Sequence, residues 1–241
     1  MDFGKTVEES FTYAKAGVVE RTDRWLKLIL AAILIGIPLT GWIMRIYRGS
    51  TPAPEVDAWG TLFIDGLKLM IVGLIYAIPL IVISFLPQLI LSGGMAGATV
   101  PVGTVVHNSD GGMSAAFGLI ILELLLMLVF EILVAIFLPI ASIRFARTGT
   151  FSEAFHFRAL IDTIGKIGWF NYIIAIILID IVIGIPLVIL AFLVIFAGIV
   201  VGHLFIALGV LIALLLLIAP PLAAFQARYL TQVYDSTIQV A

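Results

Sequence analysis

The chain has 241 residues, of which 62% are hydrophobic and only 12% are charged, and its formal net charge is −2. This composition leaves too little polar surface to cover a water-soluble globule of this size, and it offers no basic surface for nucleic acid. The chain contains no cysteine, which excludes disulfides, thiolate metal sites and cysteine nucleophiles.

The basic residues are grouped in three blocks. Eight Lys and Arg residues lie between Lys5 and Lys68, four lie between Arg144 and Lys166, and the last is Arg228. The segments between the blocks, 69–143 and 167–227, are each long enough for two membrane crossings joined by an outer turn. Because positively charged loops tend to stay in the cytoplasm, the pattern predicts a multi-pass cell-membrane protein with both termini cytoplasmic.

The first apolar run, 25–44, has basic residues on both sides and a possible chain reversal at its centre. That centre reads Ile-Gly-Ile-Pro-Leu at 35–39, which combines a helix breaker with a flexible residue. We therefore favour a short re-entrant hairpin with both ends in the cytoplasm. The alternative is one ordinary span that is kinked at the proline.

Four further apolar runs, at 67–92, 115–143, 167–198 and 204–226, are about 20 residues or longer. They predict four full crossings, and hence an all-α polytopic membrane helical bundle. The pair Pro220-Pro221 should unwind the last crossing near the cytoplasm. The Gly-rich connection 92–114 is expected to be the outer loop.

Three segments have the pattern of amphipathic helices that lie on the cytoplasmic membrane surface. In 7–18 and 151–161, apolar and charged residues alternate at helical spacing, and 57–68 leads directly into the second apolar run. Asp57 and Ser152 are the side chains expected to cap the latter two helices.

Two short motifs recur in the same order, which indicates internal repetition. Glu-Ser-Phe-Thr-Tyr at 9–13 is echoed at 153–157, and the pentapeptide 35–39 recurs unchanged at 183–187. We therefore divide the single membrane domain, 1–241, into three repeat units, namely 1–49, 55–148 and 150–235. Chance similarity among apolar sequences is the alternative.

Three acids lie deep within the apolar runs: Glu123, Glu131 and Asp180. A carboxylate at the bilayer centre costs on the order of 2.5–3.5 kcal/mol, so such residues usually mark a site. At about 1.5 Å per residue, Glu131 and Asp180 fall within roughly 3 Å of the midpoints of crossings 115–143 and 167–195, and Glu123 about 9 Å further out.

These positions suggest a proton or cation site in the membrane. Glu131 and Asp180 could meet there and share a proton or hold a cation, because both cannot ionise in a low dielectric without compensation. Glu123 would be an outward relay. The alternative is that each acid is protonated and hydrogen-bonded to a backbone carbonyl or to a polar side chain: Tyr76, Asn171 or Tyr172.

Basic and aromatic residues recur where the apolar pairs end, and they are predicted to anchor the protein at the lipid headgroups. These anchors are Arg45, Tyr47, Arg144, Arg147, Arg228 and Tyr229.

Two longer segments are similar to a known family. They read Asp-Ala-Trp-Gly-Thr-Leu-Phe-Ile-Asp-Gly-Leu-Lys at 57–68 and Arg-Phe-Ala-Arg-Thr-Gly-Thr-Phe-Ser-Glu-Ala-Phe at 144–155. Through them, and over nearly its whole length, the chain resembles an archaeal family of multi-pass membrane proteins, the domain-of-unknown-function 4013 family. The resemblance implies an archaeal cell membrane and supplies no activity and no catalytic residue.

We expect a membrane protein without catalysis of its own, which uses no cofactor and no metal and is permease-like. The first alternative is a structural subunit of a membrane assembly or homo-oligomer. The second is a lipid-modifying enzyme, whose only polar cluster would be Asp65, Arg144, Arg147 and Glu153. The expected partners are membrane lipids and, for the structural role, copies of the chain or another membrane subunit, but not nucleic acid.

Overall fold

The computed structural model describes residues 2–93 and 110–236, with side chains over 2–85 and 117–236, and the described residues contain helices and no strand. The predicted all-α class is therefore confirmed. Most of the expected outer loop lies outside the described residues. The chain divides into two compact units, unit 1 (Met1–Val72 and Leu138–Ala241) and unit 2 (Gly73–Phe137). The division into three repeats stays a prediction.

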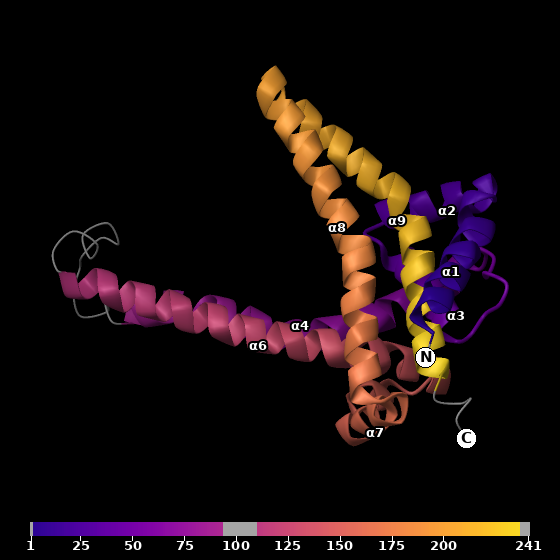
Figure 1. Ribbon diagram of the computed structural model, residues 1–241, viewed down its shortest axis with the longest axis horizontal. Helices are drawn as coiled ribbons and strands as arrows, with labels where there is room; N and C mark the ends of the chain where they lie inside the picture. Colours follow the sequence, from indigo (N-terminus) through magenta and orange to yellow (C-terminus); the bar gives the residue numbers. More distant parts are fainter. Residues whose placement is uncertain (1, 94–109, 237–241) are drawn as a thin grey trace. The chain divides into compact units, whose positions relative to one another are not determined.

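The helices follow one another along the chain and are labelled in Figure 1. They are α1 (Phe3–Ala14), a π-helical turn η1 (Lys15–Val19), α2 (Thr22–Ile33), α3 (Ile37–Tyr47), α4 (Trp59–Gly93), α6 (Asp110–Thr148), a 3₁₀ turn η2 (Phe151–Phe155), α7 (Phe157–Ile167), α8 (Trp169–Val201) and α9 (Leu204–Asp235).

Four of the described helices are long and apolar enough to cross a membrane, as predicted. The candidate spans are Trp59–Phe85, Phe117–Thr148, Trp169–Val201 and Leu204–Asp235. Between 0 and 28% of the residues in the most apolar window of each span are buried inside the protein. The spans therefore present mostly apolar surface to their surroundings, which suits a multi-pass membrane protein.

The first apolar run forms a helical hairpin and not one kinked helix. The chain leaves α2 at Ile33 and reverses through Ile35 and Gly36, whose φ angles are 59° and 71°. At about 1.5 Å per residue, α2 and α3 are each about 18 Å long or shorter, well below the roughly 30 Å of the hydrocarbon core. Neither helix could span alone, and entry of this hairpin into the membrane stays a prediction.

The C-terminal half of α9 forms the centre of unit 1. Helices α1, α2, α3, α7 and α8 all contact α9. Tyr229 of α9 is fully buried, and its hydroxyl donates a hydrogen bond of 3.1 Å to the carbonyl of Ala175 in α8. Ser10 of α1 is also fully buried, and its hydroxyl lies 2.9 Å from Oε1 of Gln232. Helices α1 and α9 are thereby joined.

Pro220 and Pro221 bend α9 but do not unwind it, which corrects the expectation from sequence. The helix continues from Leu204 to Asp235 and changes direction along its length (Figure 1). Pro221 has no N–H to bond the carbonyl of Leu217 four residues earlier. The indole N–H of Trp25 donates to that carbonyl at 2.8 Å, so α2 satisfies the group that the proline leaves free.

Helices α3 and α4 touch backbone to backbone at a pair of glycines. A Cβ atom on Gly41 would lie 1.9 Å from the carbonyl oxygen of Leu62, and a Cβ on Gly66 would lie 1.8 Å from that of Ile37. Any side chain at either position would push the helices apart. Such close approach also favours weak Cα–H···O contacts between the backbones.

The three segments predicted to lie on the membrane surface are helical, with boundaries that differ from those predicted, and their place at the membrane stays a prediction. Helix α1 begins earlier, at Phe3, because the Asp2 carboxylate accepts a hydrogen bond from the N–H of Lys5 at 3.1 Å. Asp57 does not cap α4, which begins at Trp59, because its carboxylate is bound to Arg45. The segment 151–161 is interrupted at 156, between η2 and α7. The predicted Ser152 cap is wrong because this residue lies inside η2.

Candidate functional site

Asp180 stands where α8 leaves the core of unit 1. The preceding residues on the inner face are buried, ending with Ile176 and Ile179, whereas Asp180 itself is exposed. Asp180 lines a shallow, open groove on the surface of α8 alone, and the other lining residues are all apolar: Ile177, Ile181, Gly184, Ile185, Val188 and Ile189. Asp180 is thus a single ionisable group on an apolar helix surface.

The observed helix bounds move the helix midpoints from which the depths of the acids were estimated. Because α8 continues to Val201, its midpoint lies near residue 185, and Asp180 is about 7.5 Å from it at 1.5 Å per residue. Glu131 lies about 2 Å and Glu123 about 14 Å from the midpoint of the span Phe117–Thr148. Of the two acids assigned to the centre, only Glu131 lies at the middle of its helix.

None of the three acids makes a hydrogen bond or ion pair to any residue that the structure describes. Glu131 is exposed and Glu123 is partly exposed, and both belong to unit 2. Asp180 belongs to unit 1. The proposed meeting of Glu131 with Asp180 therefore stays a prediction.

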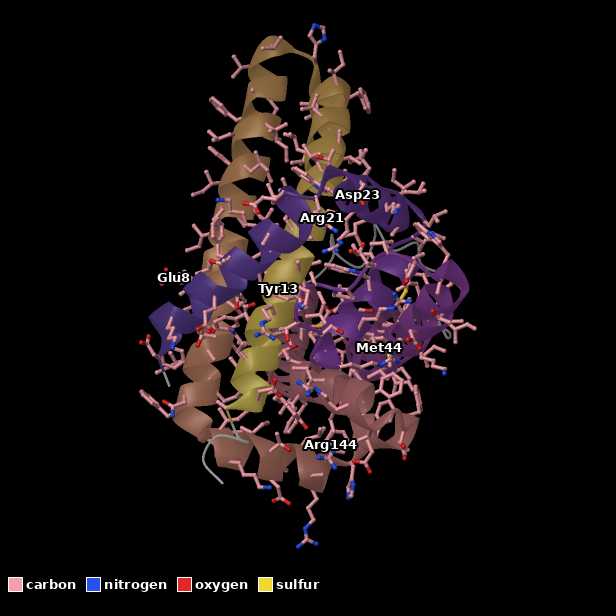
Figure 2. All side chains as sticks on the ribbon, turned by 90° about the vertical axis from the view of Figure 1, so that its right-hand side faces the viewer. Glu8, Tyr13, Arg21, Asp23, Met44 and Arg144 are labelled. Carbon is pink, nitrogen blue, oxygen red and sulfur yellow. The ribbon has the colours of Figure 1, made fainter. Side chains whose placement is uncertain are left out.

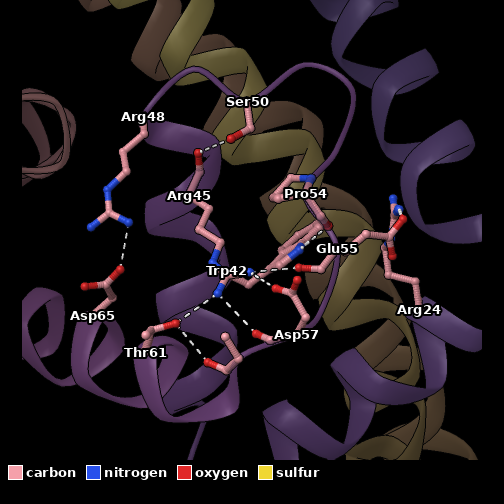
Figure 3. A network of polar contacts seen from close by, with 11 residues as sticks. Arg24, Trp42, Arg45, Arg48, Ser50, Pro54, Glu55, Asp57, Thr61 and Asp65 are labelled. Atoms are coloured by element: carbon pink, nitrogen blue, oxygen red, sulfur yellow. Dashed lines mark hydrogen bonds and ion pairs between the residues drawn. The ribbon is translucent and has the colours of Figure 1, made fainter.

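A second polar region surrounds the linker between α3 and α4 (Figure 3). The guanidinium of Arg45 lies 2.5 Å from the carboxylate of Asp57 and donates to the hydroxyl of Thr61 at 3.1 Å. The hydrogen bond from Arg45 is the main reason that the pKa of Asp57 is lowered. Arg48 binds Asp65 at 2.7 Å. These pairs attach the end of α3 to the first turns of α4.

Glu55 of the same linker forms ion pairs with two arginines, Arg21 and Arg24, which lie at the start of α2. Its Oε1 lies 3.2 Å from Arg21 and also binds the terminal nitrogen of Arg24. Arg24 is only 5% exposed, and its other terminal nitrogen donates to the carbonyl of Gly17 at 2.7 Å. The indole of Trp42 fixes the linker through a 2.9 Å hydrogen bond to the carbonyl of Pro54.

The arginines predicted as anchors at the later chain exits also bind protein groups. Arg147 donates to both carboxylate oxygens of Asp235 at 2.8 Å and to the backbone carbonyl of Tyr47 at 2.6 Å. Arg144 lies 2.5 Å from Glu153, and its hydrogen bond is the main cause that lowers the pKa of Glu153.

The remaining anchors contact aromatic or buried groups. Arg228 stacks over the ring of Tyr13 at 5.3 Å. Tyr47 and Tyr229 are buried in unit 1, and burial raises the pKa of Tyr47 to about 12. Any anchoring at headgroups would therefore come from the arginines, and that role stays a prediction.

The polar cluster suggested for a lipid-modifying enzyme is divided among three separate ion pairs. Arg144 binds Glu153, but Asp65 binds Arg48 and Arg147 binds Asp235. Sequence gives no sign of these pairings, because Arg147 and Asp235 are 88 residues apart. The described residues contain no group of three or more acids or histidines placed to hold a metal ion.

Comparison with known protein families gives a match over most of the chain. The family described as "Protein of unknown function (DUF4013)" matches residues 26–195, more than two thirds of the chain. No curated protein and no solved structure matches the chain. The matched range contains both segments that carry the resemblance, 57–68 and 144–155, as well as the three membrane acids.

Proposed function

The chain belongs to the DUF4013 family, whose function is unknown, and we propose that it is a permease-like membrane protein without catalysis of its own. In this proposal Asp180 belongs to a proton or cation site. The observation that carries it is the exposed Asp180 carboxyl in its apolar groove on α8. A cell-membrane location and cytoplasmic termini are part of the same proposal.

Charge balance supports a mobile positive partner for this carboxyl. The segments 69–143 and 167–227 contain no Lys or Arg, so the four spans offer no internal cation over these lengths. A carboxylate among apolar groups must be protonated or neutralised by a cation. Gly184, one turn beyond Asp180, leaves the groove open to such a partner. Glu131 belongs to unit 2, and its meeting with Asp180 stays a prediction from the sequence.

Flux through proteoliposomes tests this function. The purified chain is reconstituted into neutral lipid vesicles with a pH-sensitive dye inside, and proton or K⁺ entry is measured after a gradient is applied. We expect Asp180→Asn to abolish the flux that the wild type adds to empty vesicles and Glu131→Gln to reduce it. The control is Asp162→Asn, because Asp162 is an exposed carboxyl on α7.

Two outcomes would overturn the proposal. One is wild-type vesicles that admit protons and K⁺ no faster than empty vesicles. The other is an Asp180→Asn variant that conducts as well as the Asp162→Asn control.

A structural role in a membrane assembly is the second candidate, and one observation favours it. Large apolar side chains remain exposed along α8, including Phe192 and Phe196, whose stacked rings are 5.9 Å apart. In Figure 2 the side chains along the far ends of α8 and α9 are almost all carbon. Mass measurement in lipid nanodiscs tests this role, since a stoichiometric complex supports it and a monomer excludes self-association.

A further inference from the structure

A cavity of about 600 Å³ lies between the N-terminal helices and the linker 50–55 of unit 1. Its lining includes Tyr13, Gly17, Arg21, Arg24, Thr51 and Glu55. Tyr13 and Arg21 are labelled in Figure 2, and Figure 3 shows the linker and Arg24. We propose that this cavity binds a phosphate group, carried by a lipid headgroup or by free phosphate.

The walls of the cavity are held in place from both sides. The hydroxyl of Tyr13 donates to the carbonyl of Ser50 at 3.0 Å, and the Trp42 indole holds the other end of the linker. A Cβ on Gly17 would lie 2.5 Å from the Cβ of Ala53, so the π-helical turn and the linker are in direct contact beside the cavity. π-Helical turns of this kind are frequent at functional sites.

The cavity has an excess of positive charge. Arg21 and Arg24 carry two charges, and the single carboxylate of Glu55 neutralises one of them. Arg24 is held with its Nε buried and without a hydrogen-bond partner, so its donors are not all used. Tyr13 lines the cavity, and Arg228 stacks over its ring. Arg228 therefore adds a further positive charge near the cavity.

Glu55 indicates where the ligand's anionic group would lie. Its side chain is 55% exposed, whereas that of Arg24 is only 6% exposed. The carboxylate can therefore move away while the arginine stays in place. Phosphate suits this position because the forked donors of arginine match its oxygens, and a cavity of this volume lies within the range of small-molecule sites.

The surroundings offer a place for acyl chains if the phosphate belongs to a lipid. Leu26 and Leu30, which follow the arginines on α2, are 62% and 51% exposed. At 3.6 residues per turn these leucines lie on the face of α2 opposite Arg24, so the acyl chains of a phospholipid held at Arg21 and Arg24 would pass around α2 to reach them. Free phosphate would use the same arginines without the apolar contact.

The experiment uses the full chain and two probes. In the first arm, the protein in nanodiscs of phosphatidylcholine with phosphatidylglycerol is released for native mass spectrometry, and retained phosphatidylglycerol is counted. In the second arm, inorganic phosphate is titrated in neutral detergent, with thermal unfolding as the readout. The variants are Arg21→Gln and Glu55→Gln, and the control is Lys15→Gln, an exposed cation outside the cavity.

We expect Arg21→Gln to weaken binding about tenfold for whichever probe the wild type binds, phosphatidylglycerol or inorganic phosphate, since contacts to a charged group are lost. Glu55→Gln should strengthen binding, because it removes a competing negative charge while keeping an oxygen for the arginines. Retention of phosphatidylglycerol would assign the site to a lipid, and stabilisation by phosphate would assign it to the free ion.

If the two arginines had a purely structural role, the variants would not change binding in this way. The proposal is overturned if neither probe binds, if Arg21→Gln and Lys15→Gln behave alike, or if Glu55→Gln binds more weakly than the wild type. Asp180→Asn should leave binding unchanged in both arms, so this test is independent of the flux experiment.

Discussion

The glycine contact between α3 and α4 gives a sharp stability prediction for Gly66→Ala. The added Cβ would lie 1.8 Å from the carbonyl oxygen of Ile37, whereas a normal carbon–oxygen contact is about 3.3 Å. The helices would have to separate by about 1.5 Å, and a gap of even 0.5–1 Å forfeits roughly a quarter to a half of the dispersion attraction. The obstacle is backbone, which cannot rotate away.

We expect Gly66→Ala to destabilise the protein by at least about 2 kcal/mol, since overpacking costs about 1–3 kcal/mol even where side chains can adjust. The matched control is Gly73→Ala in the same helix, because a Cβ at Gly73 meets nothing within 4 Å. This control should be unchanged or gain up to about 1 kcal/mol from helix propensity.

The measurement is reversible unfolding of both variants in mild detergent, driven by SDS and followed by far-ultraviolet circular dichroism. Equal stability of Gly66→Ala and Gly73→Ala would refute the backbone contact. A loss confined to Gly66→Ala would establish it, and Gly41→Ala should then show a similar loss.

Two further predictions concern hydrogen bonds and pH. Trp25→Phe removes the donor to Leu217 and should cost about 1–3 kcal/mol by SDS unfolding, but less in a Pro221→Ala background, where the restored N–H bonds the same carbonyl. An equal loss of stability from Trp25→Phe in the wild-type and Pro221→Ala backgrounds would argue against this role of the Trp25 hydrogen bond. The pKa of Glu153 is lowered chiefly by its hydrogen bond from Arg144, so this pair stabilises the fold above pH 4.5 and its contribution is lost as the pH falls through the lowered value. Stability of the wild type should therefore fall more steeply below pH 4.5 than that of Glu153→Gln, and parallel curves would contradict the assignment.

The helical class and the crossings could be predicted because they depend on composition and run length. The reversal at 35–36 was also visible, since glycine and proline act locally. The position of Asp180 along α8 could not be predicted, because apolar residues continue to Val201 and nothing in the sequence marks where α8 ends. Asp180 therefore lies off the helix midpoint, although its chemistry was recognised.

Contacts between distant segments could not be predicted from one sequence. Trp25 gives no sign of its bond to Leu217, because the need for it arises from Pro221 nearly 200 residues later. The arginines at the chain exits suggested lipid anchoring, but Arg147 binds Asp235 and the carbonyl of Tyr47. The cavity between η1 and the linker depends on such contacts too, so no motif announces it.

The central position of α9 constrains the order in which the protein can mature. Ser10 and its partner Gln232 are separated by 222 residues, so α1 cannot make its native contacts with α9 until Gln232 has been synthesised. Contacts of such long range slow folding and leave apolar surface uncovered in the meantime. The packing of α1, α2 and α3 in unit 1 is therefore completed only after α9 has been synthesised.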